Sequence, residues 1–161
     1  MFNSRDFEGI LVTLIGEEEM GNRDKGASKA AVVLLSGGMD SATLLHHVVK
    51  NLKRGPVYAL SYNYGQRHSK ELECARRQAE LVGVASHRVI DISFLGEVLK
   101  GASVLLPGGP PVPDLRKLDK SQLDQPPTYV PNRNMILLAI AAAYAEANGI
   151  CEVFYGAHAL D

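Results

Sequence analysis

The sequence of 161 residues has only two cysteines, Cys74 and Cys151, and no tryptophan. Two thiols cannot form a four-cysteine zinc site, and we expect both to be reduced thiols of a cytoplasmic protein. An excess of charge of one sign is also lacking, because 17 basic and 18 acidic residues leave a formal net charge of -1. This balance argues against a generally basic nucleic-acid-binding protein.

Long hydrophobic runs are absent as well. The longest, residues 135–145, is too short and too rich in alanine to cross a membrane. The apolar residues 10–15 lie between acidic residues and do not resemble the core of a signal peptide. We therefore expect no contact with a membrane and a cytoplasmic location. The length and the 46% of hydrophobic residues suit one globular domain.

Strand patterns and helix patterns alternate from Lys29 onwards. Short apolar runs that end at turn residues predict buried strands, and apolar residues at helical spacing predict helices. The predicted strands are 30–35, 56–62, 87–92 and 151–155, and the predicted helices are 40–52, 69–82, 94–99 and 132–148. The alternation predicts an α/β fold in which helices cover both faces of a parallel sheet.

Two segments fall outside this alternation. Residues 1–28 are expected to form an N-terminal extension that can be flexible, in which residues 9–15 could add a strand. Residues 29–161 are expected to form the domain itself. Within it, residues 101–131 hold seven of the eight prolines and predict a long loop. Such loops in a compact domain are usually functional or mobile.

The hexapeptide SGGMDS, residues 36–41, joins the first buried strand to the first helix. Its adjacent glycines allow a sharp turn and a close approach of phosphate to backbone amides. The following helix directs its N-terminal amides to the same place, and Ser36 and Ser41 add hydroxyl donors. Asp40 suits a Mg²⁺ ion that bridges to phosphates, or it caps the helix. The pattern favours a phosphate site over a plain turn with capping residues.

Two common nucleotide-binding patterns, G-x-x-x-x-G-K-[ST] and G-x-G-x-x-G, do not occur. The hexapeptide is instead similar to the S-G-G-x-D-S signature of the PP-loop ATP pyrophosphatases. Three further stretches, YNYGQRH at 62–68, PVPD at 111–114 and YVPNRN at 129–134, resemble the 7-cyano-7-deazaguanine synthase (QueC) family of that class. The resemblance runs from about Lys29 to the last residue. It implies a Rossmann-like sheet of the adenine nucleotide α-hydrolase type.

The resemblance also implies a reaction. Members of the family convert 7-carboxy-7-deazaguanine and ammonia to 7-cyano-7-deazaguanine, a queuosine precursor, through an adenylated intermediate formed with ATP and Mg²⁺. A homodimer or a partner chain is expected, and no direct contact with nucleic acid. Two alternatives stay open, namely another PP-loop ATP pyrophosphatase of the tRNA-modifying type and a non-catalytic nucleotide-binding module.

The match to the family is incomplete at the C-terminal side. Family members continue further and carry four cysteines for structural zinc there, whereas this sequence ends at Asp161 without such a cluster. Zinc is therefore not expected here. A fragment, one piece of a split enzyme and a remnant all remain open. We expect the apolar helix 132–148 to stay partly exposed and to favour association.

Candidate site residues outside the hexapeptide lie just after strands or at the start of a helix. Arg67 could hold a phosphate or a carboxylate through a forked contact. Arg133 lies in the first turn of a helix, where a cation opposes the helix dipole, so a bound anion or a nearby carboxylate would explain it. Tyr62 and Tyr64 could stack on a base or pack in the core.

The predicted site residues form three groups. The predicted nucleotide-binding residues are Leu35, Ser36, Gly37, Gly38, Met39, Asp40, Ser41, Ala42 and Thr43. The predicted catalytic residues are Asp40, Arg67 and Arg133, with Asp40 as the candidate for Mg²⁺. The predicted substrate-binding residues are Gln66, His68, Asn134 and Asp161.

Overall fold

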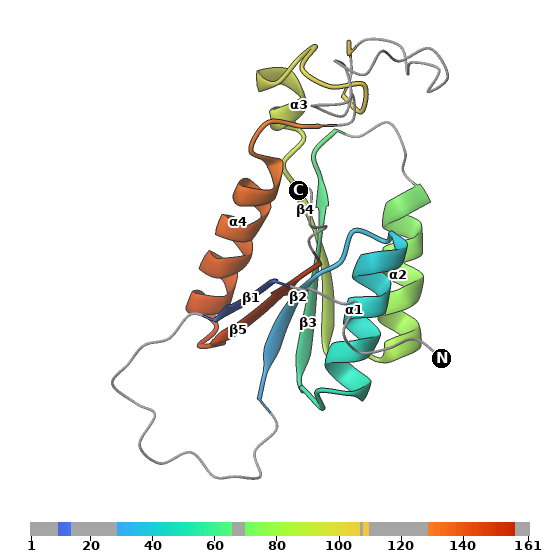
Figure 1. Ribbon diagram of the computed structural model, residues 1–161, viewed down its shortest axis with the longest axis vertical. Coiled ribbons are helices and arrows are strands. Elements are labelled where there is room, and N and C mark those ends of the chain that lie inside the picture. Colours follow the sequence, from blue (N-terminus) through green and yellow to red (C-terminus); the bar gives the residue numbers. More distant parts are fainter. Residues whose placement is uncertain (1–9, 14–28, 66–69, 107, 110–128, 157–161) are drawn as a thin grey trace, which may run out of the picture.

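A five-stranded sheet with the strand order β1-β5-β2-β3-β4 forms the centre of the computed structural model (Figure 1). The structure describes residues 10–13, 29–65, 70–106, 108–109 and 129–156. Four strands are parallel: β2 (Ala31–Leu34), β3 (Val57–Asn63), β4 (Ser86–Asp91) and β5 (Glu152–Tyr155). The predicted parallel sheet is therefore confirmed for these strands.

Helices cover both faces of the sheet, as predicted for a three-layer α/β fold. Helices α1 (Met39–Lys50) and α2 (Lys70–Val82) lie on one face, and α4 (Arg133–Ala147) lies on the other (Figure 1). The short helix α3 (Phe94–Val98) follows β4. Each face has its own apolar core, one beneath α1 and α2 and one beneath α4.

Strand β2 is buried along its whole length because both of its faces are covered. Val33 belongs to the core beneath α1 and α2, whereas Val32 and Leu34 belong to the core beneath α4. Strand β3 lies on one side of β2 and β5 on the other. The order of the strands therefore switches at β2, and in open α/β sheets ligands bind at such a switch, beyond the carboxyl ends of the strands.

The predicted strand in the N-terminal extension is present as β1 (Ile10–Thr13). It pairs antiparallel with β5, with Leu11 opposite Phe154. The sheet is thus mixed, and β1 gives β5 a hydrogen-bonded neighbour on its outer side. The division of the chain at residue 28 stays a prediction.

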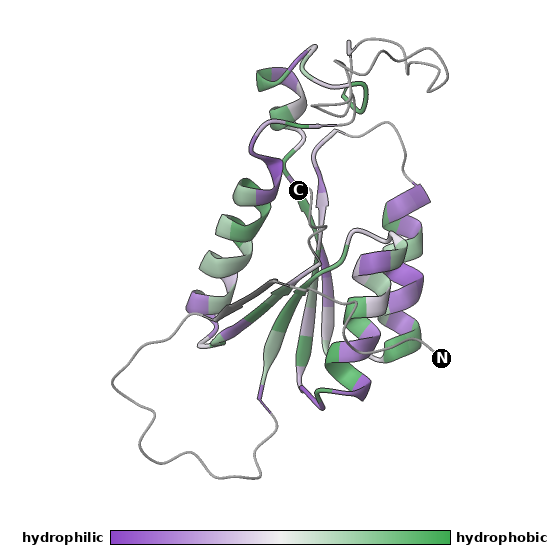
Figure 2. Ribbon diagram, in the orientation of Figure 1, coloured by the Kyte–Doolittle hydropathy of each residue, from purple (hydrophilic) through white to green (hydrophobic). Residues whose placement is uncertain are grey.

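Helix α4 begins at Arg133 and ends at Ala147, and Gly149 just beyond it has a φ of 64°, a conformation that stops helices. Asn132 occupies the N-cap position but adopts φ 51° and makes no side-chain capping hydrogen bond. The middle turns of α4 carry apolar residues on every side, and polar residues occur at its two ends (Figure 2). Only Ala141 and Ala145 of α4 are fully buried, which confirms the predicted partial exposure.

An ion pair connects two segments that are far apart in the sequence. Arg54, which follows α1, donates from Nε and Nη2 to the carboxylate of Glu152 at 2.5 and 3.1 Å. Both side chains are mostly buried, with 29% and 12% of their surface exposed. The pair therefore fixes the start of β5 against the α1 side of the molecule. Among the described helices, none has the length and hydropathy of a membrane span.

Candidate functional site

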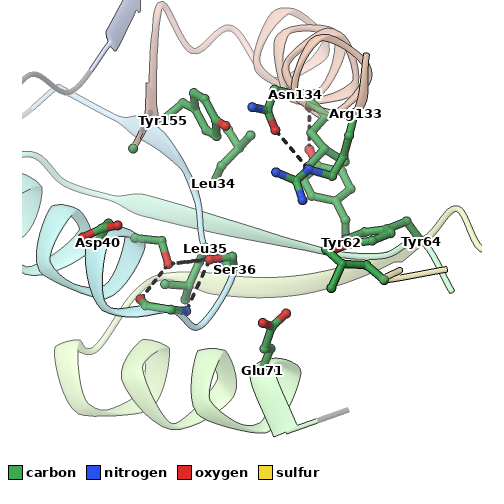
Figure 3. Close-up of a pocket in the computed structure, with 15 residues that line it drawn as sticks. Leu34, Leu35, Ser36, Asp40, Tyr62, Tyr64, Glu71, Arg133, Asn134 and Tyr155 are labelled. Carbon is green, nitrogen blue, oxygen red and sulfur yellow. Dashed lines mark hydrogen bonds between the residues drawn. The ribbon is translucent and has the colours of Figure 1, made fainter. Parts of the chain in front are cut away.

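A cavity of about 260 Å³ opens beyond the carboxyl ends of β2, β3 and β5. It lies where the strand order switches, at the place predicted for a ligand. Its polar lining comes from the loop after β2 and from the first turns of α1, α2 and α4. These side chains belong to Ser36, Asp40, Ser41, Glu71, Arg133 and Asn134 (Figure 3).

The hydroxyl of Ser41 is the centre of the loop formed by residues 36–41. Its Oγ accepts the backbone N–H groups of Ser36 and Gly37, each at 3.2 Å, and donates to the carbonyl of Gly38 at 3.0 Å. The Oγ of Ser36 lies 2.9 Å from the Oγ of Ser41. Two hydroxyls are thereby held at the cavity by a loop that is hydrogen-bonded to itself.

The two glycines of the loop have different roles. Gly37 has a φ of 90°, and a Cβ on it would lie 2.0 Å from the carbonyl oxygen of Glu71. The loop is therefore packed against the first turn of α2, which is possible only without a side chain. Gly38 is the N-cap residue of α1 with an ordinary φ of -73°, and a Cβ there would approach only the Oγ of Ser36, at 3.5 Å.

The N-terminus of α1 supplies further donors to the cavity. The first hydrogen bond of the helix runs from the amide of Ala42 to the carbonyl of Gly38 at 3.0 Å. The amides of Met39, Asp40 and Ser41 precede it, so they are the N-terminal donors that a helix leaves for a cap or a ligand. Asp40 is exposed and does not cap the helix, so the capping alternative is wrong.

Arg133 and Asn134 of α4 lie across the cavity from Ser36 and Glu71 (Figure 3). The Nε of Arg133 donates to Oδ1 of Asn134 at 3.1 Å, and its Cζ lies 5.9 Å from the centre of the Tyr64 ring. These contacts hold a cation at the start of a helix, where the dipole opposes it. The carboxylate of Glu71 lines the same cavity.

Tyrosines form the aromatic part of the lining: Tyr62 on β3, Tyr64 just after that strand and Tyr155 at the end of β5. Tyr62 donates its hydroxyl to the carbonyl of Leu137 at 3.0 Å and so joins β3 to α4. Burial raises the pKa of Tyr62. Burial also raises the pKa of Tyr64, and the charge of Arg133 opposes that rise. Both rings therefore stay neutral phenols at physiological pH.

The structure brings seven of the predicted residues to the cavity: Leu35, Ser36, Gly38, Asp40, Ser41, Arg133 and Asn134. Gly37 does not line the cavity, because this residue of the loop packs against α2. Met39, Ala42 and Thr43 do not line the cavity. The side chain of Met39 is 82% exposed, and Thr43 donates its hydroxyl to the carbonyl of Met39 at 2.8 Å. Predictions for Gln66, Arg67, His68 and Asp161 lie outside the described residues.

Sequence reasoning missed several lining residues. Glu71, Tyr155 and Leu105 line the cavity but were not predicted. Tyr155 ends β5, so the rule that ligands lie beyond strand ends could have found it. Glu71 stands in the first turn of a predicted helix, and only the packing of Gly37 against that turn places it at the site. Leu105 lies in the loop predicted for residues 101–131, but nothing in that stretch indicated which of its residues reaches the cavity.

The geometry defines a class of protein. A glycine turn, two hydroxyls and a helix N-terminus meet at the switch point of a parallel sheet, which is the arrangement of α/β proteins that bind phosphate groups of nucleotides. The family model described as "Queuosine biosynthesis protein QueC" matches residues 30–161. The chain belongs to this family.

Curated relatives support the assignment. The chain is 47% identical over 131 residues to the 7-cyano-7-deazaguanine synthase of Hahella chejuensis, covering 81% of this chain and 53% of that protein. It is 44% identical over 154 residues to the protein of the same name from Rhodopirellula baltica, covering 96% of this chain and 59% of that one. The chain thus spans somewhat more than half the length of these relatives.

Similarity to solved structures is weaker than similarity to these relatives. An NH3-dependent NAD synthetase from Campylobacter jejuni aligns with 78% of this chain and 46% of its own, at 20% identity and a TM-score of 0.48. The family assignment rests on the sequence relatives and not on this alignment.

Proposed function

We propose that this chain supplies the ATP-binding part of a ligase that converts 7-carboxy-7-deazaguanine and ammonia to 7-cyano-7-deazaguanine through an adenylated intermediate. The observation that carries the proposal is the loop of residues 36–41, which directs two hydroxyls and the N-terminus of α1 into one cavity. The names of the curated relatives support the choice of the second substrate. The queuosine precursor pathway is the context that these relatives suggest.

The phosphates of ATP fit at the loop. The amides that open α1 would hold the pyrophosphate group that leaves when a substrate is adenylated, and the hydroxyls of Ser36 and Ser41 would keep the loop in shape around it. Donors fixed in this way stabilise the charge of the leaving group without rearrangement of the site. The apolar and aromatic lining, with Leu34, Tyr62 and Tyr155, suits the flat rings of purines and deazapurines.

The charges of the cavity indicate that ATP would arrive with Mg²⁺. Among the described lining residues there are two carboxylates, Asp40 and Glu71, and one cation, Arg133. This set alone cannot neutralise a triphosphate. Mg²⁺ prefers phosphate and carboxylate oxygens, so Asp40 at the start of α1 is its proposed protein ligand. When bound, the metal would offset the negative charge of the departing pyrophosphate.

Arg133 and Asn134 are proposed to face the group that becomes adenylated. A guanidinium across the cavity from the loop could bind the carboxylate of the deazapurine acid through a forked contact. Arg67 is proposed for the phosphates, and Gln66, His68 and Asp161 for the deazapurine acid. No zinc is proposed for this sequence, because it has two cysteines and both lie exposed and unpaired.

The assembly and the compartment are proposals as well. Exposed apolar side chains at the start of α4, above all Met135 with 68% exposure, support association with a second copy or a partner chain. Exposed free thiols at Cys74 and Cys151 support a reducing compartment such as the cytoplasm.

The function is tested with the purified chain, ATP, Mg²⁺ and ammonia, with and without 7-carboxy-7-deazaguanine, by following AMP. AMP release that requires the deazapurine supports the proposed ligase. Substitution Asp40→Asn is expected to lower the rate at least tenfold, whereas Glu73→Gln, at an exposed carboxylate on α2, leaves it unchanged. AMP release that depends on tRNA instead, or ATP binding without turnover, would contradict the proposal and favour the two alternatives.

A further inference from the structure

A chain of hydrogen bonds reaches the loop of residues 36–41 from the α2 side of the sheet. Ser61 lies on β3 and is completely buried, and its hydroxyl donates to the carbonyl of Leu35 at 2.5 Å. The Nε2 atom of His87, on β4, lies 2.8 Å from the same hydroxyl oxygen. The carbonyl of Leu35 belongs to the peptide that also carries the amide of Ser36, the first residue of the loop.

The position of Leu35, just after β2, explains why its carbonyl takes a side-chain donor as its hydrogen-bond partner. The pairing of β2 with β3 runs from Ala31 to Leu34, and the amide of Leu35 still donates to the carbonyl of Leu60 at 2.8 Å. Beyond this point the chain leaves the sheet to form the loop. The hydroxyl of Ser61 binds the last carbonyl before the turn, so it fixes the plane of the peptide that joins Leu35 to Ser36.

The directions of the hydrogen bonds follow from the number of protons. A hydroxyl has one proton, and Ser61 donates it to Leu35. His87 must therefore donate from Nε2 to the oxygen of Ser61. Both the neutral ring with its proton on Nε2 and the imidazolium can do so, so the chain of hydrogen bonds is kept when His87 gains a proton.

We propose that Ser61 and His87 are positioning residues for nucleotide binding, acting through the peptide between Leu35 and Ser36. That peptide directs the amide of Ser36 to the Oγ of Ser41 at 3.2 Å, and the same Oγ orders Gly37 and Gly38. Neither Ser61 nor His87 lines the cavity. The inference rests on the proposed function, because it concerns the affinity of the loop for the phosphates of ATP.

Titration of the chain with Mg-ATP, followed by calorimetry, tests the effect on binding. Ser61→Ala is expected to raise the Kd about tenfold, and Ser61→Thr, which keeps the hydroxyl, to restore it to within about threefold. His87→Leu is expected to weaken binding, and His87→Gln, whose amide can replace the Nε2 donor, to restore most of it. Val57→Ala removes buried atoms from the other end of β3 and is the control for a general loss of stability.

A second measurement does not require nucleotide. Hydrogen exchange at the amides of Ser36 and Gly37 is expected to be faster in Ser61→Ala than in Val57→Ala. The two variants are compared under conditions, set with urea, in which their free energies of unfolding are equal. If Ser61→Ala keeps the wild-type Kd and exchange rates, or if Val57→Ala weakens binding as much as Ser61→Ala, the inference is overturned. If the wild-type chain binds no ATP, the proposed function fails, and the exchange rates alone then decide the inference. If Ser61→Ala does not fold, the Ser61→Thr and His87 variants decide it.

Discussion

Gly37 and Gly38 are adjacent residues of the same type that tolerate a side chain to different degrees. Gly37→Ala places a Cβ against the carbonyl of Glu71 at a φ of 90°, so we expect it to lower the free energy of unfolding by about 3 kcal/mol. Gly38→Ala meets no such contact and should cost less than about 1 kcal/mol. Urea unfolding of both variants measures the difference, and equal losses would contradict the packing described for Gly37.

His87 makes stability depend on pH. Burial, followed by the charge of Arg76, lowers the pKa of His87 in the folded protein below its ordinary value of 6.5. The unfolded chain therefore binds this proton more readily, and the folded state loses stability as the pH falls through 6.5 towards the lowered value. We expect His87→Gln to lose less stability than the wild type between about pH 7.5 and 5.5. Urea unfolding at the two pH values measures this. If the wild type and His87→Gln lose the same free energy of unfolding, the assignment is contradicted.

At the scale of single residues, the sequence predicted the loop better than its surroundings. Ser36, Asp40 and Ser41 are adjacent in a recognisable pattern, so local reasoning was enough to place them at the cavity. Glu71 and the buried Ser61 come from other elements. Their positions depend on how α2 and β3 pack around the loop, and no local pattern encodes that packing.

At the scale of elements, the alternation of strands and helices could be predicted because each signal is local. A buried strand such as β2 is apolar throughout, and α4 ends shortly before Gly149, which adopts a positive φ. The pairing of β1 with β5 could not be predicted, since the two segments are far apart in the sequence and the N-terminal strand carries no mark of its partner.

The ion pair between Arg54 and Glu152 yields a prediction at this scale. Glu152→Gln keeps the shape of the side chain but removes the charge of a mostly buried, doubly hydrogen-bonded pair. We expect the free energy of unfolding to fall by about 1–3 kcal/mol. Glu146→Gln, at an exposed position of α4, is the control and should change it by less than about 0.5 kcal/mol. A loss no larger than that of the control would show that the pair does not stabilise β5.

At the scale of the whole molecule, the two helical layers differ in what they expose. Figure 2 shows polar residues along α2, whereas α4 is apolar on nearly every side. Apolar surface of this kind favours association. We therefore expect the purified chain to form a dimer, which light scattering after size-exclusion chromatography would detect.

A pair of variants identifies the surface involved. Met135→Glu at the start of α4 should shift the chain towards monomer, whereas Leu81→Glu on α2, at a similar exposure of 74% against 68%, should not. A wild-type chain that is monomeric at about 100 μM would contradict the expectation, as would equal effects of the two variants.

The central claim is that the loop of residues 36–41 binds the phosphates of ATP. Calorimetric titration of the wild-type chain with Mg-ATP tests it most directly, with Ser36→Ala and Asp40→Ala as site variants and Ser86→Ala, at the amino end of β4, as the control. We predict one site per chain, an at least tenfold higher Kd for each site variant, and no change for the control. Absence of binding to the wild type, or affinities that the site variants leave unchanged, would contradict the account.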